Sequence, residues 1–482
     1  MASDVWFRLR SYAHFDYPLN KKEAIKLATN PERVVQHPFM PVIADYVKSV
    51  SRKEDSRGRR TYNKKRRPIA YASHKDSHIY SFYAHTLNLS LEKYYRVDPL
   101  CSEAVLAYRK SLPNQPRTNI HSAAEVFKKI KNYGDNCVVV ALDIAGFFDN
   151  LSHDLLKQSW ERFLNVSRLP DDYFAVYKAV TRSSAVFRPL LRELLRKAEV
   201  RRRLGRKKRV KICSSETFRK EIVPKLEPFQ NIIAQIKKEK GSPDLTKGIP
   251  QGLPISAAFA NLYMLETDKF LAEKLHAVGG VYRRYSDDIL LLLPVDQAKK
   301  IEEEVVASIK SIKLNIQVKK TQRILFKRLP SKLVAFSLDE NYKNNGKLTH
   351  IEYLGFSFDG EKVLMKNATV TKFFIRANKA IRQAKKSAIA EGKRLNKPPK
   401  LKKRKLLARL TALGYGQAYG VQVYKRECLL GDHIPRLGFF AYAKRAKKII
   451  GCHSLEKQIR QIENKIYQLI NKAEKDLHSH SL

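Results

Sequence analysis

The stretch Val281-Tyr-Arg-Arg-Tyr-Ser-Asp-Asp-Ile-Leu-Leu-Leu-Leu293 decides the fold of this 482-residue chain. Two apolar runs flank a short polar turn, a pattern that predicts two antiparallel strands joined by a tight hairpin. Asp287 and Asp288 then lie at the strand ends. A third carboxylate, Asp143, directly follows the run Cys137–Leu142, whose length and β-branched residues predict a buried strand. The sequence thus predicts three carboxylates at the ends of adjacent strands.

Carboxylates in this arrangement suit nucleotidyl transfer. That reaction uses two metal ions about 4 Å apart, one to activate a primer 3′-hydroxyl and one to hold a triphosphate. Magnesium prefers oxygen ligands and usually takes one or two protein carboxylates per ion. A single Asp in a turn is more often a simple cap. The pair bracketed by aromatic and apolar residues is more informative.

The charge of the chain indicates a polyanionic partner. Lys and Arg total 94 against 47 Asp and Glu, which gives a formal net charge of +47. Such a field attracts nucleic acid and makes binding depend on salt. An anionic membrane would also be attracted, but we expect no membrane contact because no run is apolar enough to span a bilayer and the N-terminus has no signal-peptide layout. Five scattered cysteines disfavour a zinc module or a disulfide framework, so we expect a cytoplasmic protein.

The remaining segments predict a helix-rich chain with several breaks. Residues 1–60 predict short helices that end in a basic loop, Ser51–Arg60. Residues 67–95 predict an extended piece followed by a helix. Residues 296–311 predict another helix. Ile351–Phe358 predicts a hairpin closed at Asp359-Gly360. Beyond Thr371 the pattern is helical and basic to the end.

Two of these segments leave alternatives open. Residues 188–247 form a basic insertion that either grips phosphate or is a solvated surface segment; its densest cations are Arg201, Arg202, Arg203, Arg206, Lys207, Lys208 and Arg209. The helix 455–477 has apolar residues alternating by four and three. It packs against its own domain or pairs with a second copy in a homo-oligomer. Its apolar series is Leu455, Ile459, Ile462, Ile466, Leu469 and Ala473.

Five motifs, in order, make the chain resemble reverse transcriptases over roughly residues 60–360. Tyr285-Ser-Asp-Asp288 is similar to the Tyr-x-Asp-Asp catalytic turn of that family. The other four motifs are Leu142-Asp-Ile-Ala-Gly-Phe-Phe-Asp149, Gly248-Ile-Pro-Gln-Gly-Leu-Pro-Ile-Ser256, Asn315–Thr321 and Tyr353-Leu-Gly-Phe356. Two further blocks upstream look like finger-domain blocks of the family: Arg67-Pro-Ile69 and Ala107-Tyr-Arg-Lys110.

The resemblance implies metal-binding roles. Asp143 and Asp287 would bind two Mg²⁺ ions, with Mn²⁺ as a possible substitute, and the Ile144 carbonyl would be a further ligand. Asp288 would be a ligand or an electrostatic support, because adjacent residues of a hairpin turn rarely point the same way. The catalytic residues implied are therefore Asp143, Asp287 and Asp288.

The resemblance also implies a pocket for the incoming nucleotide. Arg67 would bind the triphosphate, since guanidinium matches phosphate geometry. Arg109 is a second candidate, with a structural ion pair as the alternative. Gln251 would lie against the nucleotide and the templating base. Lys320 would protonate the leaving pyrophosphate, although Lys319 competes with it.

Phe148 and the 353–355 block complete the implied site. Phe148 lies where the family places a ring that excludes a ribose 2′-hydroxyl, so deoxynucleotides would be favoured; a core phenylalanine is the alternative, with Phe147 as its buried neighbour. Tyr353, Leu354 and Gly355 would grip the primer strand.

The resemblance implies an α+β right-hand polymerase: an N-terminal helical extension (1–60), fingers (61–136), a palm on a small antiparallel sheet that carries the catalytic aspartates (137–365), and a helical basic thumb (366–482). The implied activity is RNA-directed DNA polymerase, with an RNA template, dNTPs and a DNA product. Arg67–Tyr80 and Val105–Arg109 look most like stand-alone, defence-associated bacterial enzymes, which act against phage and often use a dedicated structured non-coding RNA. A retron-type enzyme, a catalytically idle RNA-binding scaffold and an RNA-dependent RNA polymerase stay open as alternatives.

Overall fold

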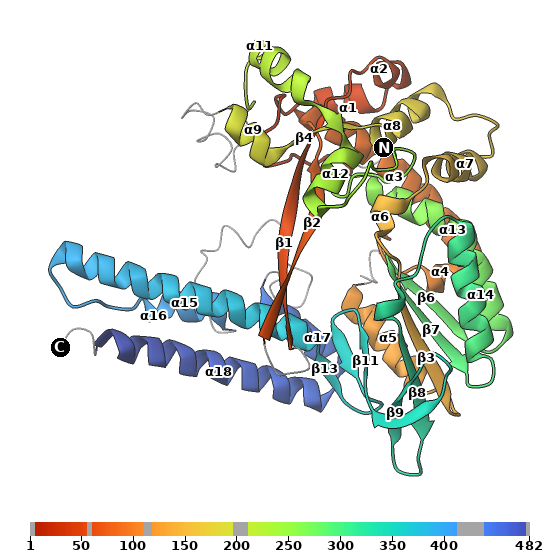
Figure 1. The fold of residues 1–482 in the computed structure, drawn as a ribbon, viewed down its shortest axis with the longest axis vertical. Coiled ribbons are helices and arrows are strands. Elements are labelled where there is room, and N and C mark those ends of the chain that lie inside the picture. Colours follow the sequence, from red (N-terminus) through yellow and green to blue (C-terminus); the bar gives the residue numbers. More distant parts are fainter. Residues whose placement is uncertain (1–4, 55–59, 110–117, 196–210, 412–437, 479–482) are drawn as a thin grey trace. The chain divides into compact units, whose positions relative to one another are not determined.

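The computed structural model describes residues 5–54, 60–109, 118–195, 211–411 and 438–478, without the side chains of residues 49–64. The chain divides into two compact units. Unit 1 comprises residues 1–112 with 142–321, and unit 2 comprises residues 113–141 with 322–482. Figure 1 labels their helices and strands. The described residues include no helix long and apolar enough to cross a membrane.

Unit 1 begins with two short helices and a long hairpin. Helices α1 (Lys21–Ala28) and α2 (Pro31–Val35) precede the antiparallel strands β1 (Val42–Glu54) and β2 (Arg60–Tyr71). The expectation of helices and a basic loop up to residue 60 is therefore wrong for residues 42–54 and for Arg60, while residues 55–59 lie outside the described residues. Residues 42–54 form a strand because they pair with β2, which comes later in the chain. The boundary expected at 60/61 falls within this single hairpin.

The hairpin belongs to a four-stranded sheet in the order β2-β1-β4-β5, with β4 at Ser184–Phe187 and β5 at Glu227–Pro228. Helices α9 (Arg188–Leu194), α11 (Ser215–Thr217) and α12 (Phe229–Lys237) follow β4 and flank β5 in the chain. The described part of the basic insertion contributes Leu191, Ile212 and Ile222 to a buried cluster with Ile43. Residues 211–222 are thus more than a solvated surface segment. Arg201–Arg209 lie outside the described residues.

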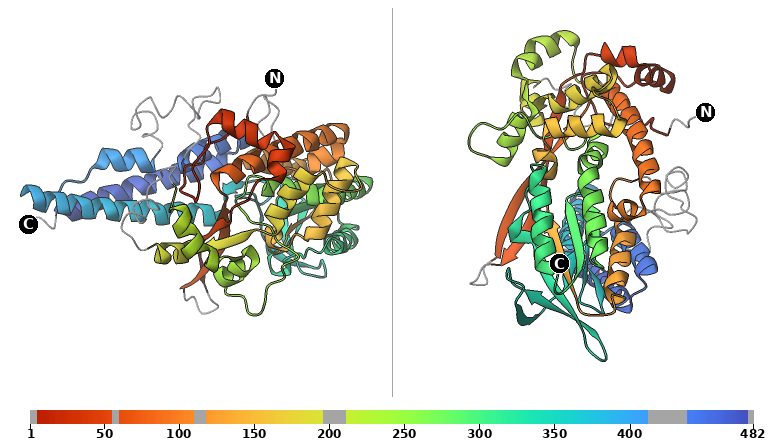
Figure 2. Two further views of the ribbon diagram at one scale, coloured as in Figure 1. Left: turned by 90° about the horizontal axis from the view of Figure 1, so that it is seen from above. Right: turned by 90° about the vertical axis from the view of Figure 1, so that its right-hand side faces the viewer.

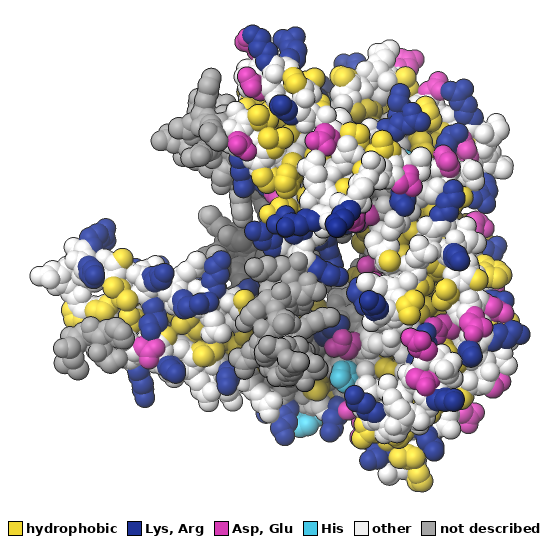
Figure 3. Space-filling model, in the orientation of Figure 1, with side chains coloured by type: hydrophobic (Ala, Val, Ile, Leu, Met, Phe, Trp, Pro, Cys, Tyr) yellow, Lys and Arg dark blue, Asp and Glu magenta, His cyan; other side chains and the backbone are white. Residues whose placement is uncertain are grey.

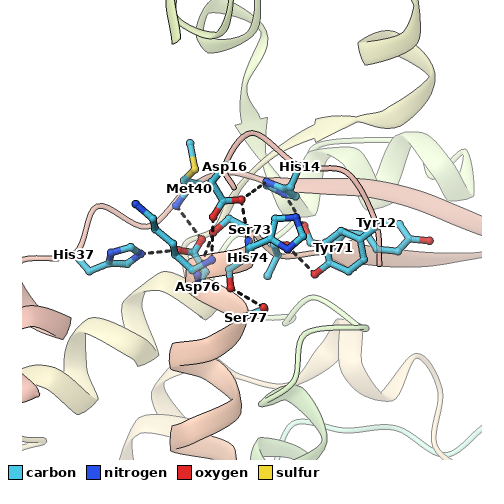
Figure 4. Close-up of polar contacts among 12 residues, drawn as sticks. Tyr12, His14, Asp16, His37, Met40, Tyr71, Ser73, His74, Asp76 and Ser77 are labelled. Atoms are coloured by element: carbon cyan, nitrogen blue, oxygen red, sulfur yellow. Dashed lines mark hydrogen bonds and ion pairs between the residues drawn. The ribbon is translucent and has the colours of Figure 1, made fainter. Parts of the chain in front are cut away.

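A network of buried polar side chains fastens the N-terminal segment to helix α3 (His74–Val97) (Figure 4). The Asp16 carboxylate accepts hydrogen bonds from the backbone N–H groups of His74 and Lys75, both at 2.9 Å. Asp76 bonds to His37 Nε2 at 2.7 Å and accepts from the N–H of Met40 at 3.0 Å. Asp16 thereby accepts hydrogen bonds from two free N–H groups at the start of α3, and Asp76 lies in the first turn of the helix. Both carboxylates are close to the positive end of the helix dipole.

The two strands predicted for residues 281–293 form where they were expected. Strands β6 (Val281–Tyr285) and β7 (Asp288–Pro294) are antiparallel, and helix α14 (Ala298–Ser311) follows them. Helix α13 (Ser256–Ala277) packs on β6, on α4 (Pro99–Ala104) and on α7 (His153–Leu164). The buried ring of Trp160 contacts Phe259 edge-on at 4.9 Å between centroids. Helices α6 (Phe147–Asn150) and α8 (Asp171–Thr181) complete this part of unit 1.

Unit 2 contains two antiparallel sheets. The first five residues of β3 (Cys137–Asp143) pair with β8 (Gln322–Arg328), which pairs with β9 (Leu333–Leu338), followed by β10 (Asn344–Leu348). The second sheet holds β11 (Ile351–Tyr353), β12 (Phe356–Phe358) and β13 (Val363–Met365). Phe358 stacks between Phe127 of helix α5 (Asn119–Lys131) and Phe326, with centroids 4.9 and 5.7 Å away.

The turn positions in the second sheet differ from those expected. The hairpin of residues 351–358 closes at Leu354-Gly355, whereas Asp359-Gly360 begins the next turn, towards β13. Asp359 accepts backbone hydrogen bonds from Glu361 and Lys362, which explains the strong local turn signal there. Both turns are therefore real, but the sequence assigned the hairpin to the wrong one.

The C-terminal part of unit 2 is helical, as predicted, with α15 (Asn367–Leu395), α16 (Lys403–Leu410), α17 (Phe439–Ile450) and α18 (His453–His478). Figures 1 and 2 show the long helices α15 and α18 side by side, and they are in contact. The buried face of α18 uses Ile470 and Leu477 rather than Leu469, because a straight helix drifts from a strict seven-residue repeat. This face packs within unit 2. The mixed fold with antiparallel sheets is confirmed.

Candidate active site

The turn between β6 and β7 places two carboxylates at the tip of a hairpin. Tyr285 pairs with Asp288, so Ser286 and Asp287 form the two-residue connection. Ser286 has a φ of 63°, and its hydroxyl bonds to the Tyr108 hydroxyl at 2.9 Å. Asp287 and Asp288 are half-buried. The hydrogen bond to Tyr108 therefore fixes the turn, and the two carboxylates on it are partly accessible to solvent.

A buried ion pair supports this turn from below. The Arg284 guanidinium bonds both oxygens of Asp268 on α13, with N–O distances of 2.6 to 3.0 Å, and both side chains are fully buried. It also donates to the Ser286 carbonyl at 3.1 Å. Burial alone would lower the pKa of Arg284, but Asp268 more than offsets this and raises it. Sequence reasoning missed this pair, although a charged residue inside an apolar strand was a visible signal.

Backbone hydrogen bonds join three of the sequence blocks at the hairpin tip. The Ile144 N–H donates to the Asp287 carbonyl at 2.9 Å, directly after Asp143. The Asp143 carbonyl in turn accepts from the Gln317 N–H at 2.7 Å, and Asn315 accepts from Ala145 at 2.8 Å. The segments that carry Asp143, Asp287 and Lys320 thus lie next to one another within unit 1, as the sequence predicted.

The Asp143 carboxylate is held by Lys320. The ammonium group lies 2.9 and 2.8 Å from the two carboxylate oxygens, and the side chains are 20% exposed for Asp143 and 45% exposed for Lys320. Asp143 therefore faces a cation and is not turned into the core. This contact differs from the role expected for Lys320 towards pyrophosphate.

The carboxylates fit a metal by donor type but do not form a closed cage. Among the described residues, no group of three or more His, Cys, Asp or Glu side chains is arranged to hold an ion. Clustered carboxylates repel one another unless a cation lies between them. Magnesium sites in nucleotide enzymes often combine one or two carboxylates with substrate phosphates instead of a complete protein cage. A metal site at these carboxylates therefore stays a prediction.

The loop Gly248–Gly252 ties the nucleotide-pocket candidates together. The Ile249 N–H donates to the Phe148 carbonyl at 2.9 Å, and the Gln251 carbonyl accepts from the Ala70 N–H of β2 at 2.8 Å. A Cβ at Gly252, whose φ is +112°, would lie 2.6 Å from the Ala70 carbonyl oxygen. Only glycine permits that approach without a shift of the backbone. The loop therefore bridges α6 and β2.

Through the hydrogen bonds of this loop, the segments that carry the candidate pocket residues Arg67, Phe148 and Gln251 lie next to one another. Arg67 is exposed on β2, three residues before Ala70. Gln251 and Phe148 are half-buried, whereas Phe147 is buried and contacts Phe148. The individual roles of these side chains stay predictions.

Arg109 makes the structural ion pair that was held open as its alternative role. Its guanidinium bonds both Glu92 oxygens at 3.1 and 2.8 Å and stacks over the Tyr95 ring at 4.3 Å. It also donates to Ser102. These contacts occupy most of its donors, so a triphosphate role for Arg109 has no support in the geometry.

The Tyr353, Leu354 and Gly355 block lies in unit 2. Tyr353 ends β11 and is buried, and Leu354-Gly355 form the half-buried turn to β12. The sequence identified the block but not the residues that hold it, which include Asn119 and Tyr442.

Comparison with known proteins shows one family match. The model "Reverse transcriptase (RNA-dependent DNA polymerase)" matches residues 204–358. The matched residues make up less than half of the 482-residue chain. The matched stretch contains Gln251, Asp287 and Asp288 but not Asp143. The hydrogen bond from the Ile144 N–H to the Asp287 carbonyl places the backbone at Asp143 next to the matched stretch. A search of curated proteins finds no match.

Comparison with solved structures finds telomerases from two Candida species. Apo telomerase from Candida tropicalis truncated from the C-terminal domain gives a TM-score of 0.38 at 10% identity, over 67% of this chain and 57% of that chain. Telomerase from Candida albicans, in complex with a fragment of telomeric RNA, gives 0.35 at 11%, over 72% and 49%. Apo telomerase from Candida tropicalis gives 0.34 at 12%, over 74% and 54%. This chain therefore spans about half the length of those chains.

Proposed function

We propose that the chain copies RNA into DNA by two-metal nucleotidyl transfer, with Asp143 and Asp287 as the principal metal ligands. The observation that carries this proposal is the 2.9 Å bond from the Ile144 N–H to the Asp287 carbonyl, which joins the two carboxylate-bearing strand ends. The reverse transcriptase match over residues 204–358 supports it independently.

The residues of unit 1 divide the work. Bound Mg²⁺ would activate the primer hydroxyl and neutralise charge on the triphosphate. Asp143 and Asp287 would hold the ions, with Asp288 and the Ile144 carbonyl in support. The buried Arg284–Asp268 pair fixes the turn from which Asp287 projects. Rigid support of this kind matters because misplacement of a metal ligand by 1 Å can cost about a hundredfold in rate.

The pocket beside the carboxylates would select the nucleotide. Arg67 would contact the triphosphate, and Gln251 the base pair. The Phe148 ring would contact C2′ of the sugar and exclude a hydroxyl group. The loop Gly248–Gly252 supports these roles, because it bonds both to Phe148 and to Ala70 near Arg67.

Incorporation of dNTPs on a primed RNA template tests the proposal. Asp287→Asn keeps the shape of the side chain but removes its charge, so activity should fall by at least about a hundredfold. Asp296→Asn, an exposed residue after β7, is the matched control and should retain activity. Full activity of Asp287→Asn would refute the metal assignment. In the same assay Phe148→Ala should admit rNTPs, and unchanged sugar selectivity would assign the gate to another residue.

We also propose that the enzyme works in anti-phage defence with a dedicated non-coding RNA. Its support is the resemblance of Arg67–Tyr80 to defence-associated reverse transcriptases and the net charge of +47, which suits a structured RNA partner. Sequencing the nucleic acids that co-purify with the protein should reveal one abundant structured RNA. A DNA product of fixed sequence that is covalently linked to RNA would favour a retron-type enzyme instead.

A further inference from the structure

The Leu354-Gly355 turn of unit 2 has an unusual backbone. The φ angles are +47° for Leu354 and +95° for Gly355, and the turn joins two directly paired strands. A two-residue hairpin with both φ values positive usually carries Asn-Gly or Gly-Gly. Leucine pays a steric penalty in the left-handed region. A residue kept in such a conformation must be held by its surroundings, and this often marks a functional site.

Two helices of unit 2 hold this turn. Asn119, the first residue of α5, donates through Nδ2 to the Leu354 carbonyl at 3.0 Å and to the Tyr442 hydroxyl of α17 at 3.0 Å. The second turn carbonyl, that of Gly355, accepts from the Lys366 N–H at 2.9 Å. Both carbonyls of the turn are thus fixed by donors outside the hairpin.

Tyr442 also limits what can occupy the turn. Its ring stacks on Phe356 with centroids 6.0 Å apart and an interplanar angle of 22°. A Cβ at Gly355 would lie 3.4 Å from the Tyr442 hydroxyl. Glycine at this position therefore leaves room for the Tyr442 hydroxyl beside the turn. The turn is half-buried, so part of its surface is accessible.

We propose that Asn119 and Tyr442 are positioning residues for the primer strand: they hold the Leu354-Gly355 turn in the conformation that contacts the primer backbone. This inference rests on the proposed polymerase function. It links the helices α5 and α17 to the primer contact. Asn119 acts directly on the turn, and Tyr442 acts on it through Asn119 and through Phe356.

Neutral substitutions test this without changing the charge near nucleic acid. Tyr442→Phe removes one hydroxyl and keeps the ring. Asn119→Leu keeps a similar volume and removes both donated bonds. Tyr467→Phe on α18 and Asn132→Leu at the exposed end of α5 are the matched controls. The measurements are the Kd of a labelled primer–template duplex, and the KM values for primer–template and for dNTP on the full-length protein.

We expect Tyr442→Phe to weaken primer–template binding about threefold and Asn119→Leu about tenfold, in line with one and two lost hydrogen bonds. The KM for dNTP should not change, since the turn does not contact the nucleotide. The double variant should bind no worse than Asn119→Leu, because the Tyr442 hydroxyl bonds to Asn119. A purely structural role would instead lower the thermal midpoint without this KM split.

The outcomes separate the two proposals. Primer–template binding unchanged in Tyr442→Phe and Asn119→Leu, in an enzyme that incorporates dNTPs normally, would overturn the inference and leave the polymerase function intact. Should Asn119→Leu fail to fold, Tyr442→Phe decides the question alone. Absence of dNTP incorporation by the unmodified protein would overturn the proposed function itself.

Discussion

The contact between Lys320 and Asp143 is the residue-scale feature with the clearest consequence. The Lys320 ammonium group bonds to both carboxylate oxygens of Asp143, the atoms that would bind a metal ion in the proposed function. A cation that binds Asp143 must therefore displace or share this contact. Because Lys320 is nearly half exposed, its attraction to Asp143 is weakened by solvent.

Removal of Lys320 should tighten metal binding at the carboxylates. We expect Lys320→Met to increase the affinity for Mn²⁺ by about threefold, the size expected for a solvent-exposed ion pair. Free Mn²⁺ can be measured by electron paramagnetic resonance in the absence of nucleotide. Lys319→Met, the neighbouring exposed lysine, should leave the affinity unchanged. Equal affinity of all three proteins would show that Lys320 does not compete with metal.

At the scale of elements, the start of α3 depends on a buried polar network (Figure 4). His14 is fully buried, contacts the Tyr71 carbonyl at 3.2 Å and faces Asp16 and His74. Burial lowers the pKa of His14 to about 4. Burial raises the pKa of Asp76 on α3, so that the folded chain holds a proton on Asp76 more tightly and on His14 less tightly than the unfolded chain does. The network therefore couples the packing of the N-terminal segment to pH.

Acid should destabilise unit 1 through His14. An unfolded histidine titrates near 6.5, so between about pH 6.5 and 4 the unfolded chain binds more protons and stability falls as pH falls. His14→Gln should reduce the slope of unfolding free energy against pH by up to about 1.4 kcal/mol per pH unit. Urea unfolding from pH 7 to 4.5 measures it, with exposed His276→Gln as control. An unchanged slope would exclude His14 as the acid-sensitive group.

At the scale of the whole molecule, the excess positive charge extends along exposed helices. Figure 3 shows Lys and Arg side chains on the helical arm that contains α15. On α15, Lys372, Arg376 and Lys379 are exposed. Ala377 and Ala380, on the inner side of the same helix, are buried. Three- and four-residue spacing places them along one stripe of the helix. Such a stripe suits contact with successive phosphates of a nucleic-acid backbone.

Neutralising this stripe should change the salt dependence of duplex binding. Lys372→Gln, Arg376→Gln and Lys379→Gln together should reduce the slope of log K against log salt by about 1 to 3. The matched triple substitution at exposed Lys299, Lys300 and Lys310 of α14 removes the same charge from unit 1 and should have a smaller effect. If both triples changed the slope equally, only the net charge would matter.

The amino-acid sequence by itself determined the elements whose signals are local. The two apolar runs around a polar turn in 281–293, the β-branched run at 137–142 and the helical period of 296–311 all indicated structures that form where expected. Each depends on residues close together in the chain, because side-chain periodicity reflects local geometry. The catalytic candidates Asp143, Asp287 and Asp288 followed from these strand ends.

Only the tertiary structure decided which distant groups meet. Residues 42–54, where a short helix and the start of a basic loop were expected, become a strand through pairing with β2. Arg109 pairs with Glu92, and Asn119 reaches Leu354 and Tyr442 across 235 and 323 positions of sequence. A hydrogen bond or ion pair can form with any partner of suitable chemistry. Its actual partner depends on how packed elements bring the chain together, which no local pattern records.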